Sequence, residues 1–74
     1  MNFDYSALTG KIIEVCGSQY VFATEISLSE RSVSLKLNNK VGWKQHEIIK
    51  ASEVLSISSN DIPRYFFKRE VQFA

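Results

Sequence analysis

The stretch SQYVFATEISLSERSVSLKLNNK, residues 18 to 40, decides the fold of this chain. Its apolar residues at 26, 28, 33, 35 and 37 nearly alternate with polar ones, which is typical of a β-hairpin. The alternation breaks between Leu28 and Val33, however, and this interval contains neither Gly nor Pro for a tight turn. The pattern favours two short helices joined by Ser27, Leu28 and Ser29, with the hairpin as the alternative.

Two serines stand where helices would begin. Ser18 suits a helix cap, because apolar residues follow one turn later. Ser29 suits a second cap, and the carboxylate of Glu30 would then meet the positive end of the helix dipole. In such a helix Val33 and Leu37 share one face at a spacing of four residues. The sequence thus predicts helices over about 19–26 and 29–38.

The flanking segments predict further helices and an extended end. Helices are expected over about 5–16, ending at Gly17, and over about 44–55, where apolar residues recur at helical spacing. A short last helix should begin near Pro63. Beyond it, Phe67, Val71 and Phe73 alternate with polar residues, although Arg69 interrupts the apolar side, and this is a strand pattern.

The order of these motifs resembles the small helix-turn-helix regulators of phages and prophages, the Cro/CI (XRE-like) class. It is most similar to a compact subfamily from phages of Gram-positive bacteria. The residues that carry the resemblance are Tyr5, Leu8, Gly10-Lys11-Ile12, Ser18-Gln19, Phe22-Ala23, Leu28-Ser29-Glu30, Ser34, Lys36-Leu37-Asn38-Asn39-Lys40, Trp43, Glu47-Ile48, Lys50, Ile62 and Tyr65-Phe66-Phe67. They span residues 5 to 67 in matching order and spacing, and this removes the hairpin alternative.

The resemblance implies an all-α fold: a compact, four- to five-helix, lambda-repressor-like domain over residues 1–67, with the helix-turn-helix at about 18–38. Residues 68–74 are expected to form an extended C-terminal tail. One position departs from the family, because Ser27 stands where a glycine with positive φ is usual. A non-glycine residue in that conformation costs on the order of 1 kcal/mol.

The resemblance also implies a DNA-reading helix over about 29–38. Base contacts are expected from Glu30, Arg31, Ser32 and Leu35. Arg31 can bind a guanine through two hydrogen bonds, whereas Glu30 is more simply a helix cap. Leu35 suits either contact with a thymine methyl group or packing against the following loop.

Contacts with DNA phosphates are expected from a second set of side chains. These are Gln19, Ser29, Lys36, Asn38, Asn39, Lys40 and Lys44. Taken singly, each lysine is more simply a solvated surface charge. As a set beside the helix-turn-helix they favour a track along one DNA strand.

The tail is expected to contact a partner through Phe67, Val71 and Phe73, which alternate with polar residues. It could pair with its twin in a homodimer, fold back on its own domain, or dock on a different regulator, in that order of preference.

Composition limits the function without choosing it. The 74 residues make one domain with a net charge of only +1, which is low for a nucleic-acid binder. No apolar run approaches the roughly 20 residues that span a bilayer, so no membrane contact is expected. Cys16 cannot form an internal disulfide, and His46 has no second metal ligand nearby. No catalytic motif is present, so neither an enzyme, a cofactor, a metal nor a small-molecule substrate is expected.

Two functions therefore stay open. In the first, the protein is a Cro-like repressor that binds a palindromic double-stranded DNA operator, with a homodimer forming on the DNA. In the second, it is a modulator or antirepressor that binds the phage CI-type repressor protein. An antitoxin with the same fold is a third alternative. Each would act in the cytoplasm of the bacterial host.

Overall fold

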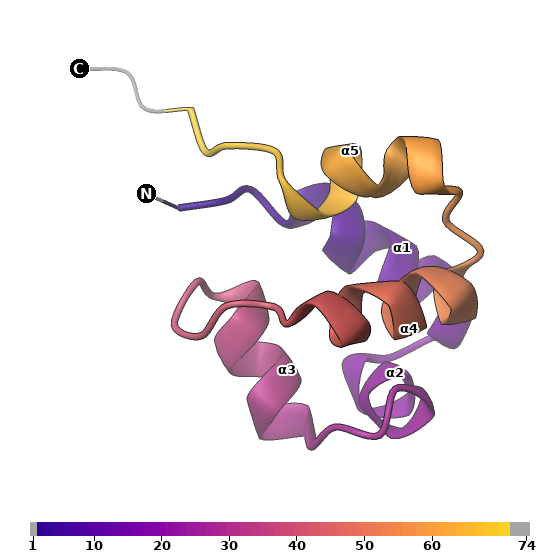
Figure 1. The fold of residues 1–74 in the computed structure, drawn as a ribbon. Coiled ribbons are helices and arrows are strands. Elements are labelled where there is room, and N and C mark those ends of the chain that lie inside the picture. The colour runs from indigo at the N-terminus through magenta and orange to yellow at the C-terminus, as the bar shows by residue number, and fades with distance from the viewer. Residues whose placement is uncertain (1, 72–74) are drawn as a thin grey trace.

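The structure, a computed structural model, describes residues 2–71 and contains five α-helices in that range. They are α1 (Ser6–Cys16), α2 (Gln19–Glu25), α3 (Glu30–Leu37), α4 (Gln45–Leu55) and α5 (Ile62–Phe66), with a single 3₁₀ turn, η1 (Ser59–Asp61), before the last (Figure 1). The predicted all-α fold is confirmed. Within residues 2–71, no helix is long and apolar enough to cross a membrane.

The helix boundaries follow from local chemistry. The hydroxyl oxygens of Ser18 and Ser29 accept hydrogen bonds from the backbone amides of Val21 and Ser32, both at 3.1 Å, and so cap α2 and α3. Gly17 ends α1 in the left-handed conformation, with φ of 82°. The caps and the stop predicted at these three positions are therefore confirmed.

The turn between α2 and α3 holds a strained residue. Ser27 has φ of 62°, the conformation that glycine adopts more easily. The turn closes through hydrogen bonds from the Ser27 amide to the Thr24 carbonyl, 3.2 Å, and from the Leu28 amide to the Ala23 carbonyl, 2.9 Å. The serine therefore keeps the positive φ that was expected of a glycine at this position.

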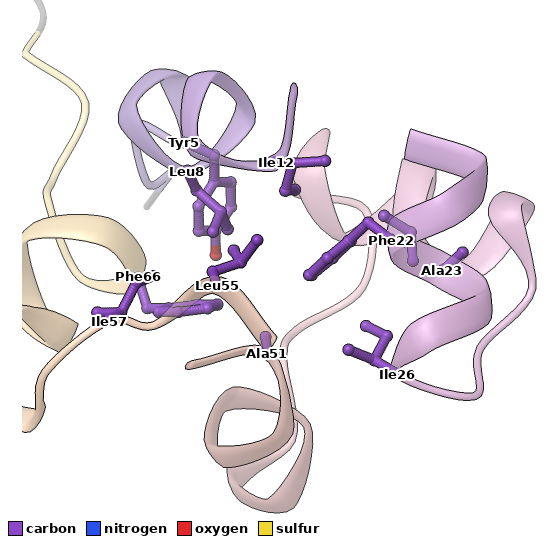
Figure 2. Packing of buried hydrophobic residues seen from close by; sticks show 11 residues of the cluster. Tyr5, Leu8, Ile12, Phe22, Ala23, Ile26, Ala51, Leu55, Ile57 and Phe66 are labelled. Atoms are coloured by element: carbon purple, nitrogen blue, oxygen red, sulfur yellow. The ribbon is translucent and has the colours of Figure 1, made fainter. Parts of the chain in front are cut away.

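One hydrophobic core joins the helices. Side chains from α1, α2, α4 and α5 converge on it (Figure 2), and Val33 adds α3. The largest side chains that are fully buried are Phe22, Phe66, Leu8, Ile12, Leu55 and Val33. In α3, Val33 is buried in the core, whereas Glu30 and Arg31 in the first turn are exposed at the surface.

The two ends of the chain pair with each other. Phe3 and Arg69 form an antiparallel bridge. The Asp4 amide donates to the Lys68 carbonyl at 2.7 Å, and the Glu70 amide donates to the Asn2 carbonyl at 3.0 Å. We call residues 2–4 and 68–70 the terminal ribbon. Of the three arrangements expected for the tail, these residues adopt the second, folding back on their own domain. Phe73 lies outside the described residues.

Candidate interaction surface

The first half of α3 presents polar groups to solvent. Glu30 and Arg31 are exposed in its first turn. Ser32 is half-buried, and its amide is taken by the Ser29 cap. Three of the four positions expected to contact bases therefore lie next to one another at the start of this helix, where the side chain of Arg31 is exposed.

Leu35 lies further along α3 and is half-buried. Its carbonyl accepts hydrogen bonds from the amides of Lys40 and Val41, at 2.9 and 3.3 Å, so the loop after α3 curls back over the helix end. Among the described residues, Leu35 is outside the group of side chains that packs on the core. Its environment is compatible with both roles expected for it.

Lys36 is not a surface residue, and the predicted phosphate contact is wrong for it. Its side chain is 5% exposed, and its ammonium lies 3.0 Å from the Glu47 carboxylate and 3.1 Å from the Gly42 carbonyl. It also stands 5.9 Å from the centre of the Trp43 ring. Lys36 therefore ties α3 to α4 and to the loop between them.

Glu47 completes this buried pair. Burial alone raises the pKa of Glu47, but the hydrogen bond from the Lys44 amide (2.8 Å) and the Lys36 ammonium outweigh that effect, so the pKa falls below its usual value. Glu47 is therefore ionised at neutral pH. It acts both as the partner of Lys36 and as a cap for the first turn of α4.

The predicted phosphate contact is also wrong for Asn39. Its side-chain oxygen accepts from the Phe3 amide and its side-chain nitrogen donates to the Phe3 carbonyl, both at 2.9 Å. Both polar groups of this amide are thus used to hold the N-terminal segment. The side chain of Asn38 donates to the Ser34 carbonyl at 2.8 Å, which satisfies it within its own helix, although it remains exposed.

These placements change the charge of the surface. Lys40 and Lys44 are exposed as expected, and Gln19 is half-buried in the first turn of α2. With Lys36 buried, residues 18–44 present three basic side chains, those of Arg31, Lys40 and Lys44, against Glu25 and Glu30. The basic excess over residues 18–44 is therefore one charge.

The same part of the chain exposes apolar side chains to which the sequence patterns assign no role. Tyr20 is 64% exposed and Val21 is 41% exposed, both in the first turn of α2. Val41, in the loop after α3, is 45% exposed. A signal for Tyr20 was available, because it lies almost opposite Phe22 on the helix and so away from the core. Exposed aromatic residues such as Tyr20 are enriched at protein contacts.

Comparison with known proteins places the chain in a family and beside a solved structure. Residues 1–69 match the family described as "Protein of unknown function (DUF739)", and the chain belongs to that family. It is also similar to the solution structure of the modulator of repression (MOR) of the temperate bacteriophage TP901-1 from Lactococcus lactis. The identity is 58% over 97% of each chain, with a TM-score of 0.80. No curated protein sequence matches the chain.

Proposed function

We propose that this protein is a phage modulator of repression that acts by binding the CI-type repressor of the phage or prophage that carries it. The observation that supports this most strongly is the 58% identity, across 97% of both chains, to the modulator of repression of phage TP901-1. At this identity over nearly the full length, with a TM-score of 0.80, the two chains share their fold. The protein would act in the host cytoplasm, where repressor and operator meet.

The surface is consistent with protein contact. DNA binding draws on several basic side chains that neutralise neighbouring phosphates. Here residues 18–44 keep an excess of one basic charge, because Lys36 is buried with Glu47. Contact with a protein would remove the exposed apolar surface of Tyr20 and Val21 from water, which favours binding. The arrangement of the Cro/CI class would then serve recognition of a regulator.

Direct binding of the purified protein to the cognate repressor tests the proposal. We expect isothermal titration to give a saturable complex, and size-exclusion chromatography with light scattering to give its stoichiometry. In a separate titration, adding the protein to a repressor–operator complex should change the operator affinity of the repressor. No complex at micromolar concentrations of both proteins would overturn the proposal.

Operator binding by this protein alone is the second candidate, and exposed Arg31 favours it. An arginine in the first turn of a groove-reading helix can bind guanine. On that hypothesis Arg31→Ala costs about 1–3 kcal/mol of specific binding and relaxes one base position, whereas Lys40→Ala weakens all DNA sequences alike. Anisotropy titrations at two salt concentrations measure both. Unchanged DNA binding in both variants would exclude this candidate.

A further inference from the structure

The terminal ribbon has one closed edge and one open edge. Phe3 and Arg69 face each other without exchanging hydrogen bonds, because the bonds of the ladder lie on either side of them. The backbone groups of Phe3 therefore point away from Arg69, and there they meet the side-chain amide of Asn39. By the same geometry, the amide and carbonyl of Arg69 point out of the opposite edge.

The open edge faces solvent. Figure 1 shows the C-terminal segment farther from α3 than the N-terminal segment, so it forms the outer side of the ribbon. Among the described residues, the Arg69 amide and carbonyl make no backbone hydrogen bond, and neither does the amide of Val71, which points the same way by the alternation of a strand. An unpaired row of this kind can take up another strand.

The side chains along this edge specify what it can accept. Phe67, Arg69 and Val71 share one face, on which the ring of Phe67 packs edge-on against Phe3 with centroids 6.2 Å apart. Phe67 is 51% exposed and Val71 is 69% exposed. Within residues 2–71, Arg69 has no acidic partner, whereas Lys68 on the other face pairs with Asp4 at 3.6 Å. This face therefore presents the basic side chain of Arg69 between the apolar side chains of Phe67 and Val71.

A second copy of this chain matches that face poorly when the two edges pair about Arg69 or Glu70. Two identical edges pair antiparallel about a twofold axis. An axis at Arg69 sets Arg69 opposite its own copy, and an axis at Glu70 sets the two Glu70 carboxylates opposite each other. Like charges directly across a ladder are destabilising. The charges therefore disfavour self-pairing in these two registers, whereas a strand that carries a carboxylate opposite Arg69 is favoured.

We propose that the outer edge of residues 68–71 binds an extended segment of the repressor by strand addition. That segment places an acidic side chain opposite Arg69, with an apolar side chain two residues away on each side, beside Phe67 and Val71. The backbone groups of Arg69 and the amide of Val71 supply the hydrogen bonds. That the added strand comes from the repressor rests on the proposed function above, whereas the chemistry of the edge does not.

Two variants test the edge without removing any hydrogen bond of the ribbon. Val71→Pro deletes an outward amide and leaves the inward bond from the Glu70 amide to Asn2 in place. Arg69→Glu reverses the charge of the face. Arg64→Glu is the matched control, because it makes the same charge change at an exposed position of α5. Circular dichroism melts verify that all three fold.

Affinity for the full-length repressor, measured by isothermal titration, is the first readout. Val71→Pro should weaken binding about fivefold or more, from the loss of one hydrogen bond. Arg69→Glu should weaken it about threefold, from the reversed cross-strand pair, whereas Arg64→Glu should leave it within about 1.5-fold of wild type. Wild-type affinity in both edge variants would overturn the inference. If light scattering shows that the wild-type protein is a dimer and that Val71→Pro is a monomer, the inference is overturned, because a second copy of the chain then occupies the edge.

A peptide titration separates this inference from the proposed function. Acetyl-Val-Thr-Glu-Thr-Val-amide is added to the ¹⁵N-labelled protein, with the analogue carrying Lys in place of Glu as its control. The Glu peptide should shift the amide signals of Arg69 and Val71, and Arg69→Glu should transfer the preference to the Lys peptide. If wild type fails to bind the repressor, the proposed function fails alone. If the peptides also leave these amides unshifted, the edge fails as well.

Discussion

The buried pair of Lys36 and Glu47 gives the sharpest test of the structure. Lys36→Met keeps the apolar stem but leaves the Glu47 carboxylate buried with only the Lys44 amide as donor. Removing one partner of a buried pair costs about 3–5 kcal/mol. We expect about 3 kcal/mol, because the Lys44 hydrogen bond remains. A chain of 74 residues has about 4–11 kcal/mol of stability in all, so the loss is a large fraction.

Urea and thermal unfolding measure this loss, and Trp43, the single tryptophan, reports it because Lys36 lies over its ring. The expected drop in Tm is about 12 °C or more. Glu47→Gln keeps an acceptor for the Lys44 amide, so the double variant completes a cycle for the pair. We expect a coupling energy of about 2 kcal/mol, within the range for residues in direct contact.

The pH dependence has a definite sign. The folded-state pKa of Glu47 lies below the usual 4.5, so the pair contributes fully above about pH 4.5 and its contribution is lost as the pH falls through the folded pKa. In Lys36→Met that loss should shrink, because the cation that lowers the pKa is gone. A destabilisation under about 1 kcal/mol, together with an unchanged acid limb, would show that Lys36 is solvated and would refute the reasoning.

Three further substitutions test the local geometry. Ser27→Gly should stabilise the protein by about 1 kcal/mol, because φ of 62° suits glycine better, and no gain in a urea titration would contradict the strain at this turn. Ser29→Ala should cost about 1 kcal/mol through loss of the α3 cap, and Ser29→Asp, which retains an acceptor, should restore it; equal stability of the two variants would argue against the cap. Asn39→Gly removes the clamp on Phe3 but fits φ of 61°, so hydrogen exchange at the Phe3 and Glu70 amides should accelerate by more than that of the core amides. Uniform exchange rates would show that Asn39 does not hold the ribbon.

Much of the fold could be predicted because its signals are local. Ser18, Ser29 and Gly17 act on backbone groups within a few residues, so their roles follow from the sequence alone. The positive φ of Ser27 was expected from the family resemblance, because related chains usually carry a glycine at this turn position. Helix ends predicted from these residues agree with the structure to within one or two residues.

The site was harder to predict, because the side chains that were assigned wrongly make contacts with residues distant in sequence. The partner of Asn39 is Phe3, 36 residues away, and that of Lys36 is Glu47 on another helix. A lysine or asparagine near a recognition helix has the same appearance in a sequence whether it faces solvent or the protein. The position of Tyr20 opposite Phe22 predicts only that it points away from the core, and a lone exposed aromatic residue leaves no periodic pattern that would mark a contact surface.

The buried and clamped residues also bear on how the fold is used. Lys36 lies in the second half of α3 and binds Glu47 of α4. Asn39 lies just after α3 and binds Phe3 of the terminal ribbon. Both residues therefore hold the protein together. Only the first half of α3 is left to meet a ligand, and there Glu30 offsets Arg31. The arrangement of α2 and α3 fixes where this surface lies, whereas the charges left on the surface decide between phosphates and a protein. On this chain those charges nearly cancel, and the apolar side chains beside them favour the protein.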